Sequence, residues 1–241
     1  MLKVELHAHT GDDPVDRIPY STRELIDRAA SLGFDALAIT LHERQLDLDR
    51  FKPYAAELGL VLIPGVERTI EGRHVLLLNF SRATEDVRTF DDLARLKSRE
   101  HGLVVAPHPF FPAFSCLRGE LERHATLFDA VERNAMYTRA VDFNRRAQSW
   151  AVRHGKPIVG NGDVHRLPQL GSTYSLVDAA PDAGAICDAV AAGRVDVETR
   201  PLSSLEAARV VSWMLLGSLS ASPQARNEDQ LAPAATILPT S

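Results

Sequence analysis

The sequence contains little cysteine and no long apolar run. Only Cys116 and Cys187 occur among its 241 residues, and they form no C-x-x-C pair. Neither a disulfide framework nor a thiolate zinc site is therefore expected. No apolar run reaches the roughly 20 residues of a membrane-spanning helix, and the amino terminus lacks the basic and apolar regions of a signal peptide. We expect a cytoplasmic protein with no membrane partner.

Long blocks of like charge and phosphate-binding loops are also missing. The formal net charge of -5 is spread along the chain, so we expect no stable nucleic-acid partner, although a short nucleotide substrate stays open. No G-x-G-x-x-G or P-loop motif follows any apolar run. This absence excludes the usual phosphate loops of open α/β sheets. The oligomeric state stays unknown at this level.

Short apolar runs alternate with amphipathic segments of helical period. The runs that predict strands cover residues 3–6, 35–40, 60–66, 74–80, 103–107, 127–132, 157–162 and 172–177, and the helical segments include 21–34, 90–102 and 140–155. Ser21 and Glu24 form a capping box at the start of the first helix. Strands that alternate with helices predict a parallel sheet. Their number favours a closed (β/α) barrel of seven or eight units over an open doubly wound sheet.

The composition changes near residue 220. Residues 203–219 predict a terminal helix that packs five apolar side chains on the barrel: Val210, Val211, Trp213, Met214 and Leu215. Residues 220–241 are rich in Ser, Ala and Pro without periodicity, which predicts a dispensable, disordered tail. We therefore expect a single domain over residues 1–219.

Most histidines stand next to predicted strands. Five of the nine come directly after a strand, namely His7, His9, His42, His108 and His165. A sixth, His74, begins a strand that is expected to form a hairpin with the GVERT segment. His7 and His9 are two residues apart, which places both side chains on one face of an extended segment. Because the loops at the carboxyl ends of barrel strands converge on one mouth, these side chains are expected to meet there.

Carboxylates accompany these histidines. Glu67 follows the third strand, Asp163 stands two residues before His165, and Asp12 and Asp13 lie in the loop after the first strand. Mixed imidazole and carboxylate ligands suit Zn, Mn or Fe, and so many ligands at one mouth predict two or three divalent metal ions. Three histidines lie within or at the ends of predicted helices and are given no role: His101, His124 and His154.

Six stretches, taken in order, form a recognisable pattern. They are ELHAHT, DALAITLHE, GVERT followed by HVLLLN, APHP, DAVERNA and GNGDVH, and they run from about residue 3 to about residue 177. Together they resemble the PHP superfamily of metal-dependent phosphoesterases, named after polymerases and histidinol phosphatase. The resemblance implies a distorted (β/α)7 TIM-like barrel with a trinuclear metal centre.

The resemblance also implies how the ligands are shared. A first metal would be held by His7, His9, Glu67 and Asp163, and a second, bridged by Glu67, would take His74 and His108. A third metal would take His42, His165 and a group from the loop after His9. That loop departs from the family's H-x-H-T-x-x-S-D-G form, and we expect Asp13 as the ligand, with Asp12 as the alternative. Leu41 also stands where many members have an aspartate.

Clustered divalent metals acidify a bound water and neutralise charge on phosphoryl oxygens. We therefore expect a metal-bound hydroxide to hydrolyse a small phosphomonoester or a nucleotide-type phosphoester, with Glu67, Asp163 and His165 as catalytic residues. The candidate substrate-binding residues are Arg44, Arg68, Arg166, Glu132 and Asn134, the last two with ligand support as an alternative role. Two other functions stay open. One is metal-dependent hydrolysis of a C–N or C–O bond, and the other is a non-catalytic metal-binding module.

Overall fold

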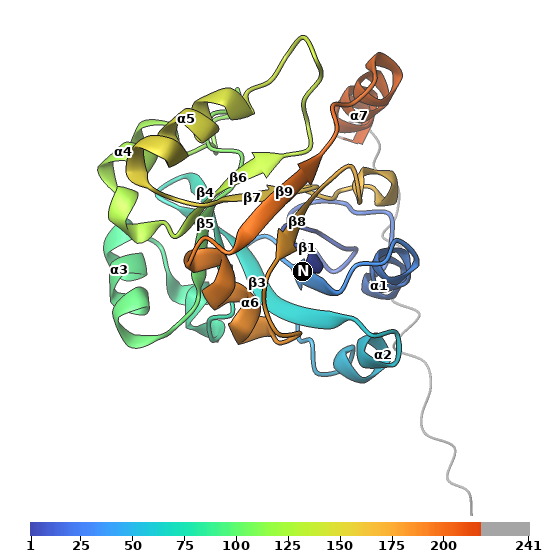
Figure 1. The fold of residues 1–241 in the computed structure, drawn as a ribbon, viewed down its shortest axis with the longest axis horizontal. Coiled ribbons are helices and arrows are strands. Elements are labelled where there is room, and N and C mark those ends of the chain that lie inside the picture. The colour runs from blue at the N-terminus through green and yellow to red at the C-terminus, as the bar shows by residue number, and fades with distance from the viewer. Residues whose placement is uncertain (218–241) are drawn as a thin grey trace, which may run out of the picture.

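The computed structural model describes residues 1–217, within which nine strands form one sheet that curls into a nearly closed barrel (Figure 1). The order across the sheet is β7-β6-β5-β4-β3-β2-β1-β8-β9. The strands are β1 (Leu2–Glu5), β2 (Ala36–Ile39), β3 (Val61–Ile70), β4 (Arg73–Leu78), β5 (Leu103–Ala106), β6 (Ala130–Asn134), β7 (Ile158–Asn161), β8 (Thr173–Val177) and β9 (Val195–Thr199). The predicted barrel is thereby confirmed.

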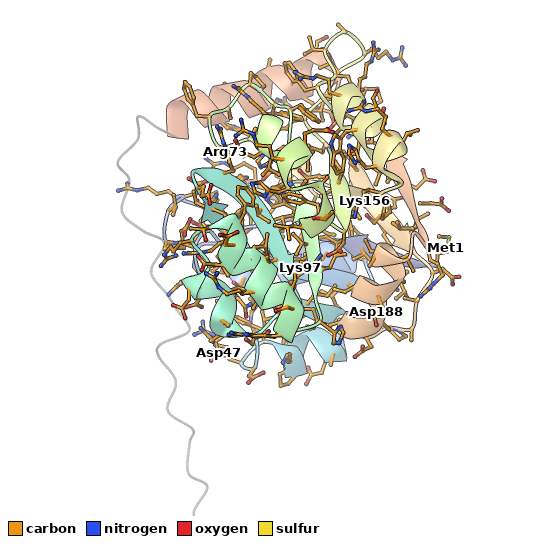
Figure 2. All side chains as sticks on the ribbon, turned by 90° about the vertical axis from the view of Figure 1, so that its left-hand side faces the viewer. Met1, Asp47, Arg73, Lys97, Lys156 and Asp188 are labelled. Carbon is orange, nitrogen blue, oxygen red and sulfur yellow. The ribbon has the colours of Figure 1, made fainter. Side chains whose placement is uncertain are left out.

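Helices lie around the outside of the sheet (Figure 1). They are α1 (Thr22–Ser31), α2 (Lys52–Glu57), α3 (Phe90–Arg99), α4 (Gly119–Arg123), α5 (Asn144–His154), α6 (Ala183–Ala191) and α7 (Ser204–Gly217), with short 3₁₀ turns at Arg82–Asp86, Ala125–Leu127 and Leu167–Gln169. Figure 2 shows α3 on the outer surface, where the Lys97 ammonium lies 2.7 Å from the Asp129 carboxylate. No helix within residues 1–217 combines the length and apolar character needed to cross a bilayer.

The local patterns of the sequence form the expected elements. All eight expected strands and all three expected helices are present, and the capping box of Ser21 and Glu24 begins α1. Gly155 ends α5 in the left-handed conformation, as a glycine after the periodic run predicts. Strand β9 is not among the expected strands, although Val195 and Val197 alternate there with acidic residues. That alternation is typical of a partly buried edge strand.

The sheet is mixed rather than purely parallel, and the expected hairpin of GVERT with the strand of His74 is confirmed as β3 and β4. Strand β4 runs antiparallel to β3 and β5, and β8 runs antiparallel to β1 and β9. Only Glu71 and Gly72 join β3 to β4, which is too short for the crossover that a parallel return needs. The other pairs are parallel, so β1, β2, β3, β5, β6 and β7 all direct their carboxyl ends to one mouth.

The barrel closes where the segment after β7 meets the segment after β1. Ala8 and Val164 form a parallel bridge, in which the N–H of His9 donates to the Val164 carbonyl over 3.1 Å. The buried carboxylate of Glu5 accepts the N–H groups of His7 and Gly162 at 3.0 and 2.9 Å. This closure places the segments HAH and DVH side by side.

The opposite end of the barrel is filled with apolar side chains. Ile186 and Val190 of α6 pack in one buried cluster with Ile63 of β3 and Val105 of β5. Cys187, on the same helix, is buried as the expected small apolar residue. With one end filled, polar chemistry is confined to the other mouth.

The terminal helix contributes to that mouth. On α7, Val210 is buried and Trp213 is half-buried, as the pattern predicts. The structure does not describe the side chains of Val211, Met214 and Leu215, which were also expected to pack there. The expected tail of residues 220–241 lies outside the described residues.

Gly160 on β7 lies against β8. A Cβ at this position would stand 2.7 Å from the Tyr174 carbonyl oxygen and 2.7 Å from Val197 Cγ1. Because a backbone atom cannot move aside easily, we expect Gly160→Ala to lower the free energy of unfolding by about 1–3 kcal/mol in urea denaturation. Gly119→Ala is the control, since nothing lies within 4 Å of a Cβ there. Equal stability of both variants would contradict this packing.

Candidate metal centre

The carboxylate of Glu67 lies at the mouth of the barrel among five imidazoles. Its Oε2 atom is 3.3, 3.4 and 3.1 Å from the Nε2 atoms of His7, His9 and His42. Its Oε1 atom is 2.8 Å from His74 Nδ1 and 3.2 Å from His108 Nε2. Glu67 itself is 1% exposed. Two oxygens that face two different sets of imidazoles form the arrangement of a bridging ligand.

Strand pairing places this carboxylate. Glu67 lies on β3 where β2 has already ended, and its N–H donates to the Leu41 carbonyl over 3.1 Å while its backbone pairs with His42. Across the hairpin, Thr69 of β3 pairs with His74 of β4. The antiparallel strand therefore brings His74 to the same mouth from the opposite direction.

Asp163 forms the second carboxylate of the cluster. Its Oδ1 atom lies 3.5 Å from His7 Nε2 and 3.3 Å from His165 Nδ1. The Asn134 side-chain amide holds the other oxygen, Oδ2, at 3.1 Å. The backbone φ angle is 48° at Asp163 and 28° at His108, and residues other than glycine rarely adopt such positive values. Such strain persists only where surrounding contacts hold the residue in place.

Other side chains fix the orientation of the imidazole rings. His7 Nδ1 lies 2.8 Å from Glu132 Oε1, and His9 and His42 each place Nδ1 3.0 Å from Asp13 Oδ2. When Nδ1–H donates to a carboxylate, the Nε2 atom carries the lone pair and faces Glu67.

The ring of His108 has a different partner. Its Nδ1 atom lies 3.5 Å from Cys116 Sγ, so Cys116, expected only as a small buried residue, also contacts the centre. Nothing in the sequence spacing signals this contact, because a long loop separates the two residues.

Two buried ring nitrogens test whether metal ions fit. The Nε2 atoms of His7 and His9 are buried and have no hydrogen-bond partner among the described residues. Their lone pairs face Glu67 Oε2 at 3.3 and 3.4 Å, which is unfavourable without a positive charge between them. Two ligands on one ion, each at about 2.1 Å in tetrahedral geometry, are themselves about 3.4 Å apart. The donor set therefore fits divalent cations.

The charge balance of the cluster leads to the same conclusion. Burial lowers the pKa of His42, but the carboxylates of Asp13 and Glu67 outweigh it and raise that pKa to about 10. Burial raises the pKa of Glu67, but the charges of the surrounding imidazoles, led by His7 and His74, hold it well below its ordinary value. The cluster thus favours positive charge beside the ionised carboxylates, and divalent cations would supply it.

The loop after β1 brings Asp13, the expected loop ligand, to His9 and His42, a set of three side chains that could hold a metal ion. Asp13 Oδ2 accepts the rings of His9 and His42, and its Oδ1 accepts the N–H groups of Val15 and Asp16 at 2.8 and 2.9 Å. Both of its oxygens are therefore already in use.

The other two acids of the loop lie apart from each other. The Asp12 carboxylate accepts the Thr22 hydroxyl at 2.8 Å, outside the cluster. Asp16, not named from the sequence, has Oδ2 3.0 Å from His165 Nε2. The sequence feature that could have identified Asp16 is its position in the same acidic loop.

Only one of the five candidate substrate-binding residues lines a cavity at the centre. Exposed Arg44 donates to the Asp12 carbonyl over 2.8 Å, and buried Arg68 donates to the Val87 carbonyl over 2.8 Å and to Glu43. Glu132 and Asn134 are 0% exposed, so they support His7 and Asp163 from behind. Of the five, Arg166 lines the second cavity at the centre. Position after a strand end did not predict this, because side chains there can point in several directions.

Two cavities meet at the cluster, and Asp163, His165 and Asp16 line both. The first, of about 530 Å³, also contains His42, Glu67, His74 and His108 on its wall. The second, of about 480 Å³, carries Arg17 and Arg166 and is called the arginine-lined cavity. A phosphoryl group at the cluster would therefore have guanidinium groups on one side.

We expect Asp13→Asn to lower the affinity for added Zn²⁺ or Mn²⁺ by about 10- to 100-fold. An amide has one acceptor oxygen and an NH₂ group, so it cannot accept the two ring N–H groups and also the N–H groups of Val15 and Asp16. Equilibrium dialysis of the metal would measure the change, with Asp12→Asn as the control. Equal affinity in the two variants would show that Asp13 does not orient the rings.

Comparison with known proteins identifies the fold. A family model described as PHP-associated matches residues 142–195, which include Asp163 and His165. No curated protein sequence matches the chain. A two-domain protein from Bacteroides vulgatus that contains a predicted PHP-like metal-dependent phosphoesterase superimposes with a TM-score of 0.65 at 18% identity, over 83% of this chain and 65% of its own length.

Two further structures share the fold at low identity. PsfC from Pseudomonas syringae has a TM-score of 0.63 at 16% identity, with 90% of this chain and 98% of PsfC covered. The lesion-specific endonuclease PfuEndoQ from Pyrococcus furiosus has a TM-score of 0.54 at 14% identity, with 81% and 57% covered. The matched segment and the shared fold agree with the resemblance to the PHP superfamily that the sequence motifs carry.

Proposed function

We propose that this chain is a metal-dependent phosphoesterase that hydrolyses a small phosphorylated substrate. The observation that carries the proposal is the Glu67 carboxylate, which faces five imidazole nitrogens at 2.8 to 3.4 Å. Such a set of buried nitrogen and oxygen atoms would destabilise a purely structural core, because each buried polar atom costs free energy unless it has a partner. The same set provides two adjoining cation positions on either side of one carboxylate.

Two groups of ligands follow from the distances. Glu67 Oε2 and Asp163 share His7 and His9, and Glu67 Oε1 shares His74 and His108. The family resemblance and the described geometry both support one divalent ion, Zn, Mn or Fe, in each group.

The proposed third cation position has the largest distance between its two histidine rings. The rings of His42 and His165 have centroids 6.4 Å apart, and an acid is needed to complete the set. We propose Asp16 for this role, because its Oδ2 faces His165 while both oxygens of Asp13 already accept N–H groups. Asp13 then acts by orienting the two neighbouring rings.

The bound cations would supply an activated water and neutralise negative charge on the phosphoryl oxygens. Glu67 keeps the two positive charges close together, and Asp163 and His165 lie where both cavities open. Arg166 offers a guanidinium for a phosphoryl oxygen from the arginine-lined cavity. In the net reaction, a water oxygen bonds to phosphorus, the bond from phosphorus to the ester oxygen breaks, and the released alcohol takes up a proton.

The substrate is proposed to be a small molecule. The absence of a stable nucleic-acid partner stays a prediction, and the endonuclease among the structures of similar fold makes nucleic acid worth including in any assay. Single-stranded and duplex oligonucleotides therefore belong in the substrate panel beside phosphomonoesters and nucleotides.

The test is a substrate screen with protein loaded separately with Mn²⁺, Zn²⁺ and Fe²⁺. Inorganic phosphate or shortened oligonucleotide released by the parent, and abolished by chelator, supports the proposal. Hydrolysis of amides or lactones without any phosphoester turnover would assign the chain to C–N or C–O bond chemistry instead. Metal binding with no turnover in any class would indicate a non-catalytic module.

A further inference from the structure

The larger of the two cavities has its charged and imidazole groups at its base. The base consists of the cluster residues Asp16, His42, Glu67, His74, His108, Asp163 and His165, and the cavity of about 530 Å³ extends outward from them. Three segments form its walls: the loop from β5 to α4, the loop from β6 to α5, and α7 with the residues before it. The β6–α5 loop rises at the same end of the barrel as α7 (Figure 1).

The walls of this cavity are apolar, and we call it the apolar cavity. Its wall side chains are Phe111, Pro112, Ala113, Cys116, Met136, Val141, Phe143, Leu202, Ala207 and Val210, with Ser115, Tyr137 and Thr138 between them. No lysine or arginine is among the described residues that line it. The arginines at the centre belong to the other cavity.

Two of the three hydroxyls of the wall already have partners. The Tyr137 hydroxyl lies 2.9 Å from Thr199 Oγ1, and the Thr138 hydroxyl accepts the N–H of Val141 at 3.0 Å. A polar ligand in the apolar cavity would therefore lose its water and gain few protein hydrogen bonds, which disfavours its binding. An apolar ligand gains from the same transfer.

The wall segments are tied to the barrel. The N–H of His74 donates to the Ser115 carbonyl over 2.8 Å, and Arg73, labelled in Figure 2, donates to the Cys116 carbonyl over 3.2 Å. The N–H of Leu202 donates to the Tyr137 carbonyl over 2.8 Å. These bonds hold the cavity open before a ligand arrives, as binding sites for small molecules usually are.

We propose that the substrate is a phosphoester whose alcohol part is an apolar ring or short alkyl chain, and that the apolar cavity holds this part. The proposal rests on the proposed phosphoesterase function. The phosphoryl group lies at the cluster beside the arginine-lined cavity, and the apolar part extends outward along Phe111 and Phe143, whose rings contact each other with centroids 5.4 Å apart. Sugar phosphates, whose hydroxyls find few free partners there, are poor substrates.

The test compares two esters that share a six-membered ring and a primary alcohol as leaving group but differ in the polarity of the ring. Cyclohexylmethyl phosphate and glucose 6-phosphate both join a six-membered ring to phosphate through a CH₂–O bond. Each is offered as the monoester and as its methyl diester to metal-loaded protein, and release of the ring alcohol is followed. We expect kcat/KM to favour the cyclohexylmethyl ester by at least about tenfold.

Two phenylalanine variants locate the effect. Phe143→Ser alters a wall side chain that is 38% exposed and should lower kcat/KM for the cyclohexylmethyl ester about tenfold, and for the glucose ester much less. Phe114→Ser is the control, since that ring is 93% exposed and does not line the cavity. It should change neither value.

Three results would overturn the proposal. Preference for the glucose ester, or an equal effect of Phe143→Ser on both esters, would remove the apolar cavity from substrate choice and leave the phosphoesterase function standing. Hydrolysis of none of the four esters by protein shown to contain metal would contradict this proposal, and the wider substrate screen would decide the phosphoesterase function separately.

Discussion

Glu67→Gln should lower turnover by at least about a hundredfold, and the metal content of the purified protein should fall with it. Glutamine keeps the size of the side chain but removes the charge that holds two cations close together, where their repulsion is strongest. The loss of a group that stabilises charge in the transition state is typically worth 10²- to 10³-fold in rate. Turnover on a substrate of the parent and elemental analysis of the same preparation measure the two effects.

His101→Gln is the matched control for this experiment. His101 is exposed and follows α3, away from the mouth of the barrel, so both turnover and metal content should equal those of the parent. If Glu67→Gln also keeps parental turnover and metal content, the carboxylate does not bridge two cations and the ligand groups built around it are wrong.

Removal of metal by a chelator should lower the thermal midpoint of the protein on the order of 10 °C. A ligand present at about 1,000 times its Kd stabilises the native state by about 4 kcal/mol. In a domain of this size, 1 kcal/mol shifts the midpoint by about 2–4 °C. Without cations, the buried nitrogens of His7 and His9 face a carboxylate with no charge between them, which adds to the loss.

The same preparation should contain more than one divalent ion per chain before chelation. Elemental analysis after supplementation with Mn²⁺ or Zn²⁺ counts them, and re-addition of metal should restore the midpoint. One ion per chain or none, together with a midpoint indifferent to chelator, would contradict the cluster.

Local structure was largely predictable because it depends on neighbours in the chain. The alternation of apolar and polar residues marks each strand, and the capping box of Ser21 and Glu24 marks the start of α1. The i, i+2 spacing of His7 and His9 also follows from strand geometry alone. The short connection of the hairpin also made the antiparallel direction of β4 predictable, whereas that of β8 depends on which edge of the sheet it joins.

Within the loops, residue type alone did not reveal in which direction each side chain points. Asp12, Asp13 and Asp16 share one loop, yet only the fold turns Asp13 to two imidazole rings and Asp16 to His165. Arg68 directly follows Glu67, but on a strand successive side chains point to opposite faces. Its guanidinium therefore lies buried against Glu43 and the Val87 carbonyl, away from the centre.

The sequence by itself determined that six histidines and two carboxylates would stand at or near strand ends, because period-two patterns and turn residues locate those ends. Only the tertiary structure decided which of these groups meet. The parallel bridge between Ala8 and Val164 joins the segment after β1 to the segment after β7 at the mouth of the barrel. Contacts between residues so far apart in the sequence leave no local pattern. The apolar cavity arises in the same way, since its walls come from three loops and a helix that approach one another only after the barrel has closed.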